Sequence, residues 1–284
     1  MTFRPRRSAL YMPASNPRAL EKARELAADV LILDLEDSVA PDSKADARTK
    51  VLEAIAKGGF GRREVVVRVN GLDTSWGAED LAAVSSSGAD AVLVPKVSSR
   101  ADVLAAREAL GNNSEMGLWV MMETPAAMLT AADIAVARSE VPGLTTMVMG
   151  TNDLAKETRA SLLPGRAAFQ PWLAMCLAAA RSAGLDILDG VFNDLEDADG
   201  FEAECQQGRE MGFDGKTLIH PRQIQPCNRR FSPTPEEVAW SRRIADLFEQ
   251  PEHQGSGVVR LEGRMVERLH SEMARRLLAV VDGG

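Results

Sequence analysis

The chain has 284 residues, of which 45% are hydrophobic, and its formal net charge of −8 argues against nucleic acid or an anionic membrane as a partner. Its three cysteines lack the spacing of a zinc site or a disulfide framework, and its longest apolar run is far below the roughly 20 residues of a membrane span. The N-terminus also lacks the pattern of a secretory signal, so we expect a cytoplasmic protein. The chain is long enough for one large core or for a core with an appendage.

Short apolar runs alternate with helical patterns along most of the chain. Most of these runs are too short and too apolar to show alternation, as is expected of parallel strands buried on both faces. Helices are predicted to begin at Asn16 and Thr124, each of which is followed by a proline. Eight strand–helix units in about 230 residues predict an α/β fold of the (β/α)8 barrel type, whose active site lies where the strands end. The predicted strands are 8–12, 30–34, 65–70, 91–95, 118–122, 146–150, 186–189 and 216–219.

Beyond Phe231 the pattern changes. Pro233 and Pro235 interrupt the chain, and one helix over 236–250 is followed by a small hairpin over 258–267 and a last helix from about 268 to 281. We therefore predict a barrel domain over residues 1–231 and an extension over residues 232–284. The extension could cover its own barrel or reach a neighbouring subunit.

Charged residues follow the predicted second, third and fourth strands. The second strand ends in Asp34-Leu35-Glu36-Asp37, the third contains Arg68 near its end, and the fourth is followed by Lys96. A buried arginine needs a carboxylate partner, so Arg68 could pair with these acids, bind a substrate carboxylate, stabilise an oxyanion or form a purely structural salt bridge. Lys96 could form a Schiff base, but we favour it as an electrostatic partner of the acids.

Two more carboxylates, Glu123 and Asp153, come directly after the predicted fifth and sixth strands and precede helices. They predict a site for a hard cation, because Mg²⁺ usually takes one or two protein carboxylates and keeps several waters. His220 follows the eighth strand, where a lone histidine is more often structural than catalytic. The chain lacks the glycine-rich and serine motifs of nucleotide-binding proteins and serine hydrolases. Together these residues favour an enzyme over a binding scaffold.

These motifs occur in the same order as in a known family, over nearly the whole chain. The chain resembles the citrate lyase β-subunit-like family of the HpcH/HpaI aldolase superfamily in Arg7-Ser8-Ala9-Leu10-Tyr11-Met12-Pro13, Asp34-Leu35-Glu36-Asp37-Ser38-Val39, Val67-Arg68-Val69-Asn70, Pro95-Lys96-Val97, Glu123-Thr124-Pro125, Gly150-Thr151-Asn152-Asp153-Leu154 and Ile219-His220-Pro221. The resemblance implies a Mg²⁺-dependent barrel, with Mn²⁺ as another possible cofactor, that acts on acyl-CoA thioesters of hydroxy-dicarboxylates.

The resemblance also implies roles for individual residues. Glu123 and Asp153 match the metal ligands of the family, and Arg68 matches its substrate-binding arginine. Glu123 is expected to contact the substrate as well. Tyr11 and Lys22 fall where the family contacts CoA.

One departure from the family lies in the extension. Lyases of the family usually carry a Met-Ile/Val-Asp segment there, whose aspartate enters the site of a neighbouring subunit as an acid/base. The equivalent segment here is Met265-Val266-Glu267. The longer side chain would displace the carboxyl group by roughly an ångström, and such a displacement can cost about a hundredfold in rate. The branch of the family that hydrolyses (3S)-malyl-CoA carries the same glutamate.

We therefore expect Mg²⁺-dependent hydrolysis of (3S)-malyl-CoA to malate and free CoA. The alternative is a lyase that cleaves a carbon–carbon bond of malyl-CoA, methylmalyl-CoA or citramalyl-CoA. In the hydrolytic hypothesis Glu267 activates water and Arg68 stabilises charge on the thioester oxygen, while Glu36 and Asp37 orient metal-bound waters and Arg68. The resemblance further implies a homo-oligomer, a trimer or a multiple of one, in which the extension completes the site of a neighbouring subunit.

Overall fold

The computed structural model describes residues 4–111 and 116–282. The chain forms two compact units. One unit is Arg6–Arg229, and the other consists of the described parts of Met1–Pro5 and Arg230–Gly284. Within the described ranges, no helix is both long and apolar enough to cross a membrane.

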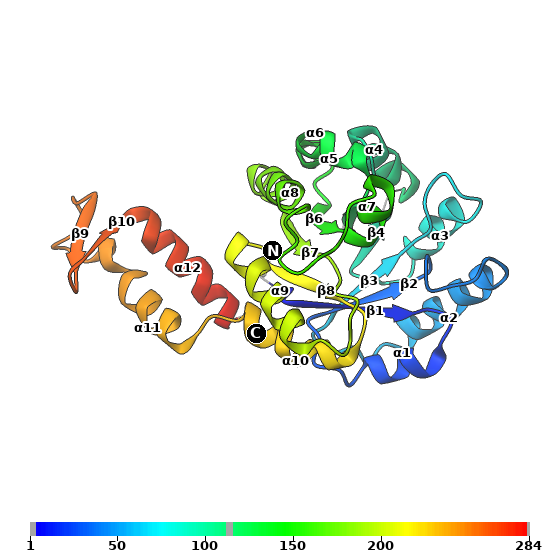
Figure 1. Ribbon diagram of the computed structural model, residues 1–284, viewed down its shortest axis with the longest axis horizontal. Coiled ribbons are helices and arrows are strands. Elements are labelled where there is room, and N and C mark those ends of the chain that lie inside the picture. Colours follow the sequence, from blue (N-terminus) through cyan, green and yellow to red (C-terminus); the bar gives the residue numbers. More distant parts are fainter. Residues whose placement is uncertain (1–3, 112–115, 283–284) are drawn as a thin grey trace. The chain divides into compact units, whose positions relative to one another are not determined.

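Eight parallel strands of the larger unit close into a barrel in sequential order, which confirms the predicted (β/α)8 fold (Figure 1). The pairing is in register at the ends that carry the polar residues, with Asp34 opposite Arg68 and Met122 opposite Met149. The strands are β1 (Ser8–Pro13), β2 (Val30–Asp34), β3 (Glu64–Arg68), β4 (Ala91–Val94), β5 (Gly117–Met122), β6 (Leu144–Met149), β7 (Asp186–Asp189) and β8 (Gly215–Leu218).

The helices of this unit surround the barrel (Figure 1). As predicted, Asn16 and Thr124 accept hydrogen bonds from N–H groups of the first turn, and a proline follows each. The α-helices are α1 (Pro17–Ala23), α2 (Lys44–Lys57), α3 (Gly77–Val84), α4 (Arg100–Ala109), α5 (Pro125–Leu129), α6 (Ala131–Val136), α7 (Thr151–Thr158), α8 (Gln170–Ser182), α9 (Ala198–Met211) and α10 (Ile224–Phe231), and short 3₁₀ turns lie at Pro41–Ser43, Ala137–Ser139 and Pro221–Gln223.

Apolar side chains of strands β1 to β7 make up a buried core. Trp119 is its largest member, with none of its surface exposed. Burying one large aromatic and many branched side chains contributes most of the stabilisation of such a fold. The core residues are Ala9, Val30, Ile32, Val66, Ala91, Leu93, Trp119, Met121, Val148 and Leu188.

Three buried charged residues, Asp189, Lys216 and Arg166, and the partly buried Glu204 join β7, β8, α9 and the segment before α8. Lys216 Nζ lies 3.0 Å from Asp189 Oδ2 and 2.6 Å from Glu204 Oε1, and Arg166 Nη1 lies 2.7 Å from Asp189 Oδ1. Asp189 and Lys216 have no exposed surface. Burial alone would raise the pKa of Asp189, but Lys216 and Arg166 hold it below its usual value. Sequence patterns did not reveal this cluster.

The smaller unit has its own hydrophobic core, in which Phe248, Val259 and Val266 are buried. It contains α11 (Pro235–Ile244), a 3₁₀ turn (Leu247–Glu249), the antiparallel pair β9 (Val258–Leu261) and β10 (Arg264–Glu267), and α12 (Arg268–Asp282). The predicted hairpin is confirmed, whereas the predicted helix over 236–250 ends early at Ile244. Leu247 and Phe248 leave the helix and pack into this core.

Candidate active site at the carboxyl ends of the strands

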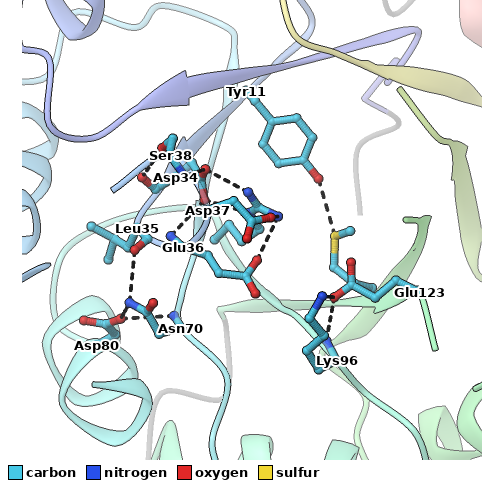
Figure 2. A network of polar contacts seen from close by, with 12 residues as sticks. Tyr11, Asp34, Leu35, Glu36, Asp37, Ser38, Asn70, Asp80, Lys96 and Glu123 are labelled. Atoms are coloured by element: carbon cyan, nitrogen blue, oxygen red, sulfur yellow. Dashed lines mark hydrogen bonds and ion pairs between the residues drawn. The ribbon is translucent and has the colours of Figure 1, made fainter. Parts of the chain in front are cut away.

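The two carboxylates predicted to bind a cation lie close together. Glu123 follows β5 and is buried, and Asp153 lies in the first turn of α7, which follows β6. Lys96 contacts both: its Nζ lies 2.7 Å from Asp153 Oδ2 and 3.6 Å from Glu123 Oε1. This confirms Lys96 as an electrostatic partner of the acids. Its backbone N–H also donates a 2.7 Å hydrogen bond to Glu123 Oε1, and its φ of 57° is rare for a residue other than glycine (Figure 2).

Gly150 makes room for the Glu123 side chain. A Cβ atom at this position would lie 2.4 Å from the Glu123 Cβ and 2.5 Å from its Oε2. Real Cβ atoms do not approach other atoms so closely, so any larger residue would displace the carboxylate. The glycine at the end of β6 is therefore required by the site rather than by its own backbone conformation.

The donor set fits a magnesium ion. Glu123 and Asp153 offer carboxylate oxygens, and waters could complete the coordination as Mg²⁺ prefers. Among the residues that the structure describes, no group of three His, Cys, Asp or Glu side chains could hold a metal. A site of two carboxylates suits Mg²⁺ and does not suit Zn²⁺, which takes three or four nitrogen or sulfur ligands in most proteins. The assignment of Glu123 and Asp153 as ligands stays a prediction.

Arg68 is held by the acids at the end of β2. Its Nε and Nη2 donate hydrogen bonds of 2.6 and 2.8 Å to the two oxygens of Asp34. Its Nη1 lies 2.8 Å from Glu36 Oε2 and donates a 3.2 Å hydrogen bond to Asp37 Oδ2. The contact with Glu36 is a close ion pair without hydrogen-bond alignment. Of the roles considered for Arg68, pairing with the acid cluster is therefore observed.

Tyr11 covers one face of the Arg68 guanidinium group. The Cζ atom of Arg68 lies 4.8 Å from the centre of the tyrosine ring, which is a cation–π contact. The Tyr11 hydroxyl donates to Met121 Sδ at 3.4 Å, and burial raises the pKa of the phenol. Figure 2 shows Tyr11 on one side of this network and Lys96 with Glu123 on another.

Side chains of Lys44 and Asn70 hold the backbone of the acidic loop Leu35–Asp37, which follows β2. Lys44 Nζ donates to the backbone oxygens of Leu35 and Glu36 at 2.9 and 2.6 Å. Asn70 Nδ2 donates to the Leu35 oxygen at 3.1 Å and to Asp80 Oδ2 at 2.6 Å (Figure 2). The asparagine after Arg68 therefore supports the loop that carries the partners of Arg68.

The pKa of Glu36 is raised to about 8, mainly because the carboxyl group is buried; the Arg68 guanidinium group lowers this pKa, and the Glu123 and Asp37 carboxylates raise it. A cation bound nearby would lower this pKa again. The Glu36 carboxyl group can therefore hold a proton near neutral pH when the site carries no metal.

A cavity of about 360 Å³ opens above these residues. Arg68, Glu123 and Asp153 line it together with Tyr11 and Asp37, so the structure brings five of the predicted site residues to one cavity. Sequence reasoning placed Asp34 among three acids that could pair with Arg68 but did not single it out as a site residue, and it missed the role of Gly150. Both of these residues line the cavity, and the rest of the lining is Pro13, Ser38, Met121, Met149, Thr151, Asn152, Val191, Thr217 and Ile219.

Three predicted residues are not among those that line the cavity. Glu36 lies beside Arg68, as described above. Lys22 is exposed on α1, and Glu267 is exposed at the end of β10 in the smaller unit, where its N–H donates to His270 Nδ1. His220 caps the 3₁₀ turn after β8 by accepting a hydrogen bond from the Arg222 N–H at 3.1 Å, as expected of a structural histidine.

The closed barrel, with two paired carboxylates and a clamped arginine at its carboxyl-terminal face, has the features of a (β/α)8 enzyme. The chain belongs to the HpcH/HpaI aldolase/citrate lyase family, whose model matches residues 7–221. This confirms the resemblance predicted from the motifs and the prediction of an enzyme.

The chain is also similar to individual proteins of known activity and to a solved structure. The chain is 50% identical over 275 residues to a (3S)-malyl-CoA thioesterase of Cereibacter sphaeroides, covering 97% of this chain and 94% of the relative. It is 35% identical over 291 residues to an L-malyl-CoA/beta-methylmalyl-CoA lyase of the same species, covering 93% and 91%. Among solved structures, CitE of Mycobacterium tuberculosis in complex with magnesium, acetoacetate and coenzyme A is 28% identical, with a TM-score of 0.77 and 98% of both chains covered.

Proposed function

We propose that the protein hydrolyses (3S)-malyl-CoA to malate and free CoA with Mg²⁺ as its cofactor. The observation that carries this proposal is one cavity that combines the Glu123 and Asp153 carboxylates with the clamped Arg68 guanidinium group. The identity of 50% with a (3S)-malyl-CoA thioesterase over nearly the whole chain supports the choice of substrate and reaction.

The residues of the cavity suit this chemistry. When held by Glu123 and Asp153, Mg²⁺ would supply a Lewis acid for the carboxylate and hydroxyl oxygens of the malyl group. Arg68 would stabilise the negative charge that develops on the thioester oxygen, because a fixed cation in a partly buried site is worth more than one in water. Tyr11 would keep water from one face of that cation. Lys22 would contact the CoA part of the substrate, outside the cavity.

Water must be activated before it can attack the thioester. We assign this step to Glu267 of a neighbouring subunit in a homo-oligomer, a trimer or a multiple of one, with residues 232–284 as the element that completes the site. Glu267 would take a proton as the water oxygen bonds to the thioester carbon. The carbon–sulfur bond then breaks, and the thiolate takes up a proton to leave as CoA. Exposure of Glu267, and of the apolar side chains of Met265 and Leu269 near it, supports contact with another subunit.

Cleavage of a carbon–carbon bond is the alternative function. The observation that favours it is the 35% identity with an L-malyl-CoA/beta-methylmalyl-CoA lyase over nearly the same length. A lyase and a thioesterase could share the cation site and Arg68, so the choice rests on the residue that handles the proton.

One assay separates the two reactions. The protein is incubated with (3S)-malyl-CoA and Mg²⁺, and free thiol and glyoxylate are followed in parallel. We expect thiol to form without glyoxylate. Glyoxylate that forms with little thiol would overturn the hydrolytic proposal.

Replacing Glu267 with aspartate is expected to lower thiol release by about a hundredfold and to raise the share of glyoxylate, because the shorter carboxylate is the one found in lyases. The same assay gives both rates. Glu272→Asp is the matched control, since Glu272 is an exposed glutamate of the same extension. If Glu267→Asp behaves like the control, Glu267 does not act in the site.

A further inference from the structure

We propose that Asp34 is the positioning residue of Arg68, which fixes the guanidinium group so that its remaining N–H groups meet the substrate. This inference rests on the proposed function. The sequence analysis predicted that Glu36 and Asp37 orient Arg68. We assign this role to Asp34 instead, which was not among the predicted site residues.

The barrel itself brings the two residues together. Asp34 ends β2 and Arg68 ends β3, and the two are partners in the register of these neighbouring strands. Both side chains are buried, with 2% of Asp34 and 7% of Arg68 exposed. The carboxylate meets the guanidinium group along one edge, through bonds of 2.6 Å from Nε and 2.8 Å from Nη2. Such a bidentate pair fixes both direction and distance.

The Asp34 carboxylate is itself immobilised. Its Oδ1 accepts a 3.0 Å hydrogen bond from the Glu36 N–H, and its Oδ2 accepts a 3.1 Å bond from the Ser38 N–H. With the two bonds from Arg68, four donors point at two oxygens, so rotation of the carboxylate would break several bonds at once. A buried charge that is paired and hydrogen-bonded in this way is a rigid support.

The other two acids hold Arg68 less firmly. The Asp37 side chain is 65% exposed and accepts a single bond of 3.2 Å, and the Glu36 contact lacks hydrogen-bond alignment. Glu36 and Asp37 both contact Nη1 of Arg68, whereas Asp34 is bonded to Nε and Nη2. Asp34 and Asp37 both line the cavity. Substrate oxygen atoms can displace the single 3.2 Å bond to Asp37, whereas displacing Asp34 would break two shorter bonds to Arg68.

Asp34→Asn tests this role. Asparagine has the same shape, but it removes the charge and turns an NH₂ group toward the guanidinium donors, so Arg68 would rotate toward Glu36 and Asp37. We expect kcat for thiol release to fall by about 100-fold while KM changes by less than about threefold, because the arginine acts on charge that develops in the transition state. A fall confined to folded yield, with normal kcat per folded protein, would overturn the proposal.

The same strand offers a matched control at its other end. Asp29 precedes β2 and accepts bonds of 2.8 Å each from Nε and Nη2 of Arg7, so it also forms a bidentate pair. Asp29 is not in the lining of the cavity. Asp29→Asn is expected to lower thermal stability about as much as Asp34→Asn does, with kcat unchanged. Equal losses of kcat in the two variants would mean that both pairs serve only the fold.

A double-mutant cycle shows whether Asp34 acts through Arg68. In an Arg68→Ala background, Asp34→Asn should reduce kcat by less than about twofold more, because the group that Asp34 positions is already gone. Free guanidinium ion should restore part of the activity of Arg68→Ala and none of the activity of the double variant. Multiplicative effects, or equal rescue of both variants, would contradict the proposal.

Crystal structures of the parent protein and of Asp34→Asn separate this inference from the proposed function. The Arg68 guanidinium group should lie against residue 34 in the parent and against Glu36 and Asp37 in the variant. An unmoved guanidinium group would overturn the positioning role whatever the reaction is. A parent protein that turns over no hydroxyacyl-CoA would overturn the proposed function even if the guanidinium group moves.

Discussion

Glu123→Gln and Asp153→Asn are each expected to lower kcat/KM for (3S)-malyl-CoA by about a thousandfold, or about 4 kcal/mol of transition-state stabilisation. Each change keeps the shape of the side chain and removes the negative charge that a divalent cation requires. The ammonium group of Lys96 lies within 4 Å of both carboxylates. With one carboxylate neutralised, less negative charge would remain to offset the repulsion between this ammonium group and the cation. Steady-state kinetics over a range of Mg²⁺ concentrations gives the loss of activity, and titration calorimetry gives the loss of Mg²⁺ affinity.

Two exposed acids on outer helices provide the controls. Glu53→Gln on α2 and Asp133→Asn on α6 remove the same kind of charge from residues that do not line the cavity, and both should leave Mg²⁺ affinity and kcat/KM unchanged. Unchanged Mg²⁺ affinity in Glu123→Gln and Asp153→Asn would show that the cation binds elsewhere or that the reaction does without it.

The largest effect on stability is expected at Asp189, in the buried cluster beneath α9. Asp189→Asn would leave Lys216 and Arg166 buried, with Glu204 as their one remaining anionic partner among the described residues, and breaking a buried pair in this way costs about 3–5 kcal/mol. Urea unfolding followed by circular dichroism measures the loss. Glu140→Gln is the control, because the ion pair of Glu140 with Arg100 is exposed and such pairs contribute about 1 kcal/mol or less. Similar losses in both variants would contradict the role given to the cluster.

The charges of this cluster also make the stability of the protein depend on pH. Lys216 and Arg166 hold the pKa of Asp189 below its usual value, so this contribution to stability is complete above the unfolded pKa of about 3.9 and is lost as pH falls through the folded pKa. Burial alone would lower the pKa of Lys216, but Asp189 and Glu204 raise it. The contribution of Lys216 is therefore complete below about pH 10 and is lost as pH rises through the folded pKa. Urea midpoints between pH 3 and pH 7 should fall less steeply in Asp189→Asn than in the parent protein.

The barrel and the location of its site were predictable because each depends on local patterns. Buried parallel strands are short apolar runs, and the polar residues that follow such runs must meet at one end of a barrel. This reasoning brought Arg68, Glu123 and Asp153 to one cavity. It could not identify the main partner of Arg68, because three acids lie at the end of β2 or just after it and only the register of β2 with β3 selects Asp34.

Long-range contacts account for what sequence patterns did not show. Lys216 looks like an ordinary polar residue at the start of a short strand, and its burial depends on Asp189 and Glu204, which lie on β7 and α9. Gly150 carries no local signal either, since its φ is not positive and only the approach of Glu123 requires a glycine there. In the proposed function, the place of Glu267 depends on an assembly of subunits, which no pattern within one chain encodes.

The register of β2 and β3 has a consequence for how the barrel assembles. A slip of one residue would place Arg68 opposite an apolar neighbour of Asp34 and would turn the two charged side chains toward opposite faces of the sheet. Each would then be buried without its counterion, at a cost of several kcal/mol. The Asp34–Arg68 pair therefore disfavours misaligned strands during folding. A substitution that weakens this pair is expected to increase the share of misfolded chains as well as to slow turnover.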